Sequence, residues 1–247
     1  MARTALSGRL TWRVATLADI RDETPSVRTL VLDVPDWPGH LPGQHIDVRL
    51  TAPDGYQTER SYSISSASTS DGRVEVTVQR IADGEVSPYL TDTLKVGDPL
   101  ELRGPVGGWF VWRVRQPAPV LLIGGGTGVA PLMAMIRTRA AVRGRQPFRL
   151  IYSVRSPDDV CYAAELARRV REDRGLDVHY VYTRSVPEGW SEPPRRIDVA
   201  TVNTHGWPPD FEPDCFVCGP TGFVEVVADI LVATGHDPRR VRTERFG

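Results

Sequence analysis

The spacing of apolar and polar residues changes near residue 116, and this change divides the chain into two halves. Up to Arg115, short runs of alternating apolar and polar residues are separated by Asp-Gly turn signals, which is typical of antiparallel strands. We expect strands at residues 13–17, 27–33, 45–50, 60–65, 73–78 and 99–102. Six short strands with tight turns predict a small antiparallel β-barrel, with one short helix at 87–94 beside it.

Beyond a Pro-rich linker at 116–119, continuous apolar runs alternate with helix-length segments. The run at 120–123 is typical of a strand that is buried on both faces. Further strands are expected at 149–154, 178–183 and 215–218, and helices at 131–142, 159–174 and 223–234. This alternation predicts a doubly wound α/β parallel sheet. The sequence therefore predicts two domains, residues 1–115 and residues 116–247.

Composition narrows the class of protein without identifying it. Apolar residues make up 40% of the 247 residues and charged residues 25%, as in globular proteins. The formal net charge of −1 gives no reason to expect nucleic acid or an anionic membrane as a partner. No apolar run approaches the roughly 20 residues that span a bilayer, and the N-terminus has no signal-like stretch. We therefore expect a cytoplasmic protein.

A glycine-rich segment at 124–131 joins the first strand of the second half to its first helix. Backbone amides of such a turn approach a pyrophosphate closely, and the helix N-terminus adds a partial positive charge. Pro131 replaces the last glycine of the G-x-G-x-x-G pattern and suits the first turn of a helix. No Gly-Lys-Ser/Thr follows, which excludes a Walker loop. We expect Gly126, Thr127 and Gly128 to bind a dinucleotide; the alternative is a glycine-rich loop without a ligand.

The choice of dinucleotide depends on charge near the second strand of this half. An NAD-binding fold usually places an acidic residue about 20 residues past the glycines, on the ribose 2′-hydroxyl. No acidic residue occurs from Leu102 to Pro157, whereas arginine is frequent there. Ser153 and Arg155 end the second strand, and a hydroxyl with a guanidinium suits a 2′-phosphate. We therefore predict NADPH over NADH; the alternative is a solvated arginine face.

A second motif lies at residues 60–63, in the strand-rich half. The guanidinium of Arg60 suits a phosphate, the ring of Tyr62 covers an aromatic group, and Ser63 hydrogen-bonds a ring nitrogen. In a strand, Arg60 and Tyr62 share one face and Ser63 lies on the other, so a bend or an edge position is needed to bring all three to one ligand. The motif suggests a flavin site.

The segment 84–87 supports this interpretation. It ends a strand-loop and opens the short helix expected at 87–94. We expect Ser87 to cap this helix, and the helix N-terminus to attract an anion.

Taken together, the chain resembles the ferredoxin–NADP reductase superfamily of flavoprotein pyridine-nucleotide oxidoreductases. Any one of the shared motifs is weak, but their ordered set is specific. The motifs are Arg60-x-Tyr62-Ser63, Gly84-x-Val86-Ser87, Val96-Gly97-Asp98, Gly104-Pro105-x-Gly107, the loop 124–131, Cys218-Gly219-Pro220 and Arg242-Thr243-Glu244-Arg245-Phe246. The resemblance implies a flavin-binding barrel followed by an NADP-binding α/β domain, with nicotinamide and isoalloxazine meeting between them.

The resemblance also implies roles for individual residues. On the FAD side it places Arg60, Gly84, Val86 and Ser87 at the pyrophosphate, Tyr62 on the flavin ring, Ser63 near N5, and Glu244 and Phe246 near the flavin. On the NADP side it places Gly126, Thr127 and Gly128 at the pyrophosphate, Ser153 and Arg155 at the 2′-phosphate, and Cys218 and Gly219 beside the nicotinamide. Ser63, Cys218 and Glu244 are then the expected catalytic residues.

Cysteine usage limits what else the chain carries. A plant-type [2Fe–2S] cluster needs a C-x₄-C-x₂-C pattern, which is absent here. Cys215 and Cys218 are three residues apart, so on a strand they face opposite sides, which argues against a redox disulfide. The histidines lack zinc-ligand spacing, and we expect no metal. Electrons are therefore expected to leave the flavin for another protein or a small molecule.

The sequence thus predicts a monomeric NADPH-dependent reductase that passes electrons through bound FAD to a separate ferredoxin or oxygenase (monooxygenase) component. One alternative is a flavin reductase that releases reduced flavin. The other is an electron-transfer or regulatory flavodomain that binds nucleotide without turnover. FMN is the alternative to FAD.

Overall fold

Alternating side chains in the first half build a six-stranded antiparallel sheet. In the computed structural model, which describes residues 10–246, its strands are β1 (Arg13–Thr24), β2 (Val27–Asp33), β3 (His45–Thr51), β4 (Gln57–Ser63), β5 (Arg73–Gln79) and β6 (Pro99–Val106). Their order is β4-β3-β6-β1-β2-β5. A bridge between Ile64, just past β4, and Val76 of β5 closes the sheet on itself. The predicted antiparallel barrel is confirmed.

The helix expected at 87–94 is present over residues 87–93. Ser87 and Pro88 are helical, and the helix continues as a five-residue π-helix, η1 (Tyr89–Thr93). The prediction that Ser87 caps a helix is wrong, because the Ser87 hydroxyl accepts a hydrogen bond from the backbone N–H of Ile81 at 3.1 Å. Ser87 therefore closes the loop 81–87 on itself.

The second half forms a five-stranded parallel sheet in the order β11-β10-β7-β8-β9. Its strands are β7 (Val120–Gly125), β8 (Phe148–Val154), β9 (Leu176–Tyr182), β10 (Asp214–Pro220) and β11 (Val241–Phe246). Its helices are α1 (Val129–Ala141), α2 (Ala163–Glu172), α3 (Val199–His205) and α4 (Thr221–Ala233), with 3-10 turns at η2 (Gly126–Gly128), η3 (Pro157–Asp159), η4 (Pro209–Phe211) and η5 (Pro238–Arg240). The predicted doubly wound sheet is confirmed, and β11 is a strand that the sequence did not predict.

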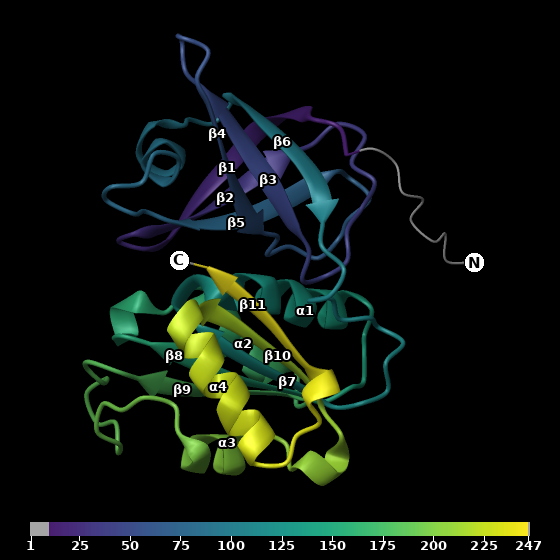
Figure 1. The fold of residues 1–247 in the computed structure, drawn as a ribbon, viewed down its shortest axis with the longest axis vertical. Helices are drawn as coiled ribbons and strands as arrows, with labels where there is room; N and C mark the ends of the chain where they lie inside the picture. The colour runs from purple at the N-terminus through teal and green to yellow at the C-terminus, as the bar shows by residue number, and fades with distance from the viewer. Residues whose placement is uncertain (1–9, 247) are drawn as a thin grey trace.

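Figure 1 shows the barrel stacked on the α/β domain, with α1 and α2 on the side of the sheet that faces the barrel and α3 and α4 on the other. The strand β7 is buried along its whole length and serves both sides. Leu122 packs with α1, whereas Ile123 packs with α3 and α4. None of the helices in residues 10–246 is long and apolar enough to cross a membrane.

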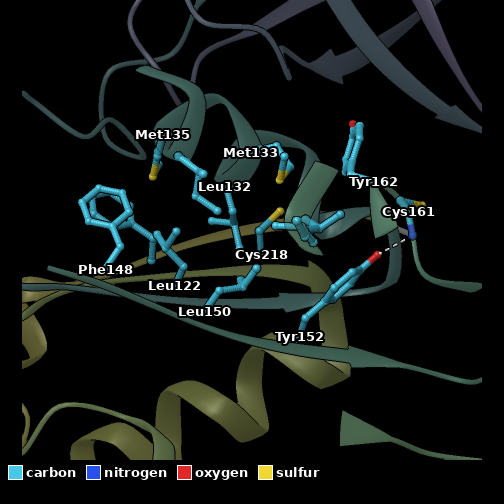
Figure 2. Close-up of a cluster of buried hydrophobic side chains, with 14 of the residues drawn as sticks. Leu122, Leu132, Met133, Met135, Phe148, Leu150, Tyr152, Cys161, Tyr162 and Cys218 are labelled. Atoms are coloured by element: carbon cyan, nitrogen blue, oxygen red, sulfur yellow. Dashed lines mark hydrogen bonds between the residues drawn. The ribbon is translucent and has the colours of Figure 1, made fainter. Parts of the chain in front are cut away.

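The core between the parallel sheet and α1 holds the largest apolar cluster. Figure 2 shows Leu132 and Met133 of α1 packed over Leu122 and Leu150 of the sheet, with Cys218 of β10 among them. Burying each large apolar side chain contributes about 1.5–3 kcal/mol. The cluster also receives Phe110 and Trp112 from the segment after the barrel, so this segment anchors one domain on the other.

Candidate functional site

A cavity of about 580 Å³ lies at the seam between the two domains. Sites for small molecules usually measure about 300–1,000 Å³, so its size suits an organic cofactor. Both domains supply its walls, because strands β3, β4 and β5 meet the loop after β7 and the ends of β10 and β11 there. The predicted site residues that line it are Arg60, Tyr62, Ser63, Gly84, Val86, Ser87, Thr127, Cys218, Glu244 and Phe246.

The strand β4 brings the 60–63 motif to this cavity from an end of the barrel sheet. Although Arg60 and Tyr62 alternate with Ser63 along the strand, all three side chains line the cavity. Tyr62 is partly buried against the barrel core, and burial raises the pKa of its phenol to about 12, with the nearby charge of Arg60 opposing the shift. Arg60 is more than half exposed, and its guanidinium lies 3.7 Å from the Glu85 carboxylate. The motif thus presents a neutral phenol inside the cavity and a cation at its mouth.

Ser63, Cys218 and Glu244 come together although they belong to three different strands. The Ser63 hydroxyl donates to Glu244 Oε1 at 2.5 Å, and the Cys218 thiol lies 3.7 Å from the same oxygen. Cys218 and Glu244 are neighbours in the parallel pairing of β10 with β11. The geometry gathers the three predicted catalytic side chains at one point of the cavity.

The electrostatics of this group favour uncharged forms. Burial raises the pKa of Glu244, opposed by the hydrogen bond from Ser63 and by the charge of His45. Burial, together with the charge of Glu244, raises the pKa of the Cys218 thiol well above its ordinary value. A protonatable carboxyl beside a neutral thiol can hold or move a proton, but the thiol is poorly suited to act as a nucleophile.

The glycines at this part of the site differ in how closely they are packed. Gly126 has a φ of +56°, and a Cβ there would meet open space, so its backbone is free to approach a ligand. Gly128 is different, because a Cβ there would lie 2.2 Å from the carbonyl oxygen of Cys218. Gly219 is close-packed too, since a Cβ added there would lie 2.7 Å from the Phe223 ring. At both Gly128 and Gly219 the packing leaves no room for a side chain.

A second cavity, of about 210 Å³, continues from the first along the carboxyl ends of the parallel strands. Gln79, Thr127 and Phe246 line both cavities. The predicted residues Gly126, Ser153 and Arg155 line only the second. This continuity lets one dinucleotide run from the parallel sheet toward the barrel, as open α/β sheets place their ligands.

The charges at this end include residues that sequence reasoning missed. Arg184 lies beside Arg155, because its backbone N–H donates to the Arg155 carbonyl at 2.9 Å. Within residues 10–246, neither guanidinium takes part in an ion pair. Asp159 lines the same cavity, and its carboxylate accepts a hydrogen bond from the Ser156 hydroxyl at 2.6 Å. Asp159 lies just beyond the stretch from Leu102 to Pro157 that lacks acidic residues, and Arg184 lies beside Arg155 because the chain continues past the paired strands β8 and β9.

The first cavity likewise has wall residues that no motif marked, namely His45, Thr77, Gln79 and Glu85. His45 pairs with Ser63 in the antiparallel register of β3 with β4. Only the strand pairing reveals such neighbours. In the described part of the chain, no three His, Cys, Asp or Glu side chains are grouped to hold a metal ion, and the three cysteines are free and buried.

The barrel, the parallel sheet with its glycine loop, and the joined cavities define a class of protein: two-domain oxidoreductases that bind a flavin and a nicotinamide dinucleotide. Comparison with known proteins agrees. Residues 14–111 match the Oxidoreductase FAD-binding domain, and residues 122–229 match the Oxidoreductase NAD-binding domain. The chain belongs to the ferredoxin–NADP reductase superfamily of flavoprotein reductases.

Individual relatives support this assignment. The glycine betaine monooxygenase reductase subunit of Chromohalobacter salexigens is 33% identical over 229 residues, which cover 91% of this chain and 61% of that protein. The toluate 1,2-dioxygenase electron transfer component of Pseudomonas putida is 32% identical over 209 residues, or 83% of this chain and 58% of that protein. The chain spans about three fifths of the length of these relatives.

Among solved structures, the FAD/NAD-binding domain of nitric oxide dioxygenase from Vibrio cholerae superposes with a TM-score of 0.80 at 28% identity. The superposition covers 95% of this chain and 98% of that one. The two structures therefore share the fold over nearly all of the chain.

Proposed function

We propose that this protein is an NADPH-dependent reductase that passes electrons through bound FAD to a separate acceptor. The observation that carries the proposal is the cavity at the seam, where Ser63 of the barrel meets Cys218 and Glu244 of the α/β domain. A site assembled from both domains suits a reaction between two cofactors, one bound by each domain.

When bound, the nicotinamide supplies a hydride and the isoalloxazine ring accepts it. The chain contributes binding and orientation. Arg60 at the mouth of the cavity would bind the FAD pyrophosphate, and Tyr62 would pack on the flavin ring. The Ser63 hydroxyl and the Glu244 carboxyl would hold a proton beside N5, because burial keeps the carboxyl protonatable.

The unpaired guanidinium of Arg155, next to the buried Ser153, supports NADPH as the electron donor. Arg184 adds a second cation near the same place. Each hydrogen bond to a charged group contributes about 1.5–3 kcal/mol, and two would favour the 2′-phosphate by on the order of a hundredfold or more. Asp159 is the feature that would favour NADH, but its carboxylate is held by Ser156.

The acceptor is proposed from the relatives. One is the reductase subunit of a monooxygenase and another the electron transfer component of a dioxygenase. We therefore propose that this chain, acting as a monomer, donates to an oxygenase component or to a ferredoxin that serves one.

Anaerobic titration of the purified protein with NADPH and with NADH tests the proposal. We expect a yellow protein whose flavin absorbance is bleached by NADPH at lower concentration than by NADH, and whose flavin is released by denaturation as FAD. Retention of the flavin through gel filtration would set it apart from a flavin reductase that releases its product. A protein that takes up no flavin, or whose flavin neither nucleotide bleaches, would refute the reductase.

A further inference from the structure

The barrel meets the α/β domain along the outer face of one strand, β5. Val74, Val76 and Val78 of this strand point into the barrel core. Because side chains alternate along a strand, the residues between and after them point outward. Glu75, Thr77 and Gln79 are these outward residues, and each one bonds a different element of the α/β domain.

Glu75 forms the first of these contacts, with Arg137 of α1. The Arg137 guanidinium donates to Glu75 Oε2 at 2.8 Å and to the carbonyl oxygen of Ser65, two residues past Ser63, at 2.9 Å. The same guanidinium forms a bidentate pair with Glu165 of α2 at 2.6 and 3.0 Å. Its side chain is only 10% exposed. Arg137 thus joins α1 and α2 to β5 and to the segment that directly follows β4.

The charges in this cluster are fixed by their partners. Although burial opposes ionisation of Glu165, the hydrogen bonds and charges of Arg137 and Arg169 hold the pKa of this carboxyl at about 2. On the barrel side, Arg21 of β1 pairs with the second oxygen of Glu75. Glu165 therefore stays ionised near neutral pH and keeps its ion pair with Arg137.

Thr77 forms the second contact, with Tyr162 at the start of α2. Figure 2 shows Tyr162 pointing away from the apolar cluster with its hydroxyl outermost, and that hydroxyl bonds Thr77 Oγ1. Thr77 bonds Thr29 of β2 at 2.8 Å, and Thr29 donates to Glu23 of β1 at 2.8 Å. The other Glu23 oxygen accepts the backbone N–H of Tyr162 at 2.8 Å. These bonds form a closed ring that spans both domains.

The backbone at Tyr162 supports the importance of this ring. Its φ of 59° is unusual for a bulky residue and is strained, so the surroundings must hold it there. Gln79 forms the third contact, where its side-chain oxygen accepts from the Thr127 hydroxyl at 3.3 Å in the wall shared by the two cavities. The row of contacts along β5 therefore ends at the site.

We propose that Arg137 and Tyr162 are positioning residues, which fix the register of the α/β domain along β5 and thereby set the distance between the two cofactor rings. This inference rests on the proposed function. Hydride transfer needs the reacting atoms about 3–3.5 Å apart, and a displacement of about 1 Å can cost about a hundredfold in rate. Neither residue lines the cavity, so they act on the chemistry through the domain arrangement alone.

The test compares Arg137→Met with Arg139→Met in the full, flavin-loaded chain. Arg139 lies on the same helix and is at least as buried, but its partners, Asp173 and the Gln146 carbonyl, belong to the α/β domain. Rapid mixing with NADPH gives the limiting rate of flavin reduction and the apparent Kd. The long-wavelength charge-transfer absorbance reports whether the reduced nicotinamide stacks on the flavin.

We expect Arg137→Met to lower the limiting rate at least tenfold and to weaken the charge-transfer band, with the Kd for NADPH changed less than threefold. Tyr162→Phe should do the same to a smaller extent, and Arg139→Met should leave both readouts within twofold of the wild type. If Arg137→Met does not fold, Glu75→Gln is measured in its place.

Equal rates and equal charge-transfer bands in Arg137→Met and Arg139→Met would overturn the inference while leaving the reductase intact. A wild-type protein that NADPH and NADH both fail to reduce would instead overturn the proposed function, and the positioning role with it. Two separate results therefore identify which of the two statements is wrong.

Discussion

Ser63 and Glu244 are 181 positions apart in the chain and share a hydrogen bond of 2.5 Å across the seam between the domains. The bond joins β4 of the barrel to β11 of the α/β domain. Burial raises the pKa of the Glu244 carboxyl above its ordinary value of 4.5. The folded protein therefore binds this proton more tightly than the unfolded chain does, which makes stability depend on pH.

Replacing Glu244 with Gln should remove this pH dependence. In the wild type, the stabilisation from the bound proton is complete below pH 4.5 and is lost as the pH rises through the folded-state pKa. Glutamine does not titrate, so the Tm of Glu244→Gln relative to wild type should rise as the pH increases. Thermal unfolding between pH 4 and pH 8 measures this, with Glu172→Gln, at an exposed glutamate away from the cavity, as the control. If the Tm of Glu244→Gln ran parallel to that of the wild type across this pH range, the raised pKa of Glu244 would be contradicted.

Arg60→Ala should weaken FAD binding. The loss of a hydrogen bond to a charged phosphate costs about 1.5–3 kcal/mol, or roughly tenfold to a hundredfold in Kd. Titration of FAD into flavin-free protein, followed by fluorescence, measures the change. Arg73→Ala is the matched control, because Arg73 is equally exposed on the barrel but pairs with Asp33 away from the cavity. Equal affinities in the two variants would show that Arg60 does not touch the flavin nucleotide.

Arg155→Ala should separate the two nicotinamide dinucleotides. If its guanidinium binds a 2′-phosphate, the Kd for NADPH rises about tenfold or more, whereas the Kd for NADH changes less than twofold. Arg184→Ala should act in the same direction, because Arg184 lies next to Arg155. Equilibrium titration of the wild type and of both variants with each nucleotide gives the Kd values to be compared. An equal loss for NADH and NADPH would assign these arginines to the part that the two nucleotides share.

The sequence predicted the fold more completely than it predicted the residues of the site. The alternating pattern of strands such as β2 and β5, and the unbroken apolar run of β7, predicted a barrel followed by a parallel sheet. The strand β11 was missed because it offers only one buried apolar residue, Val241, among polar ones. This segment forms a strand because it pairs with β10, although its own sequence has no strand pattern.

The site was predictable where the ligand-facing residues follow each other in the chain, as in the 60–63 motif. His45 and Gln79 were not, because they reach the cavity through strand register, which depends on the whole sheet. Gly128 belongs to the glycine pattern, and the structure adds a packing requirement that the motif does not reveal, because two backbones approach closely there.

Gly128→Ala is the sharpest test of that packing role. A Cβ at this position would lie 2.2 Å from the Cys218 carbonyl oxygen and 2.8 Å from Gly219 Cα, and both are backbone atoms that cannot turn aside. The loop after β7 must then move away from β10, at a cost typical of overpacking, about 1–3 kcal/mol. We therefore expect a lower Tm and, because Cys218 lies in the cavity wall, slower flavin reduction.

Gly222→Ala provides the matched control for this substitution. Gly222 lies in α4, where a Cβ would meet nothing within 4 Å, and alanine in a helix is favoured over glycine by up to about 1 kcal/mol. Its Tm should equal or exceed that of the wild type. If Gly128→Ala were as stable as Gly222→Ala, the loop after β7 would accommodate a Cβ at residue 128, and the packing role of Gly128 would be wrong.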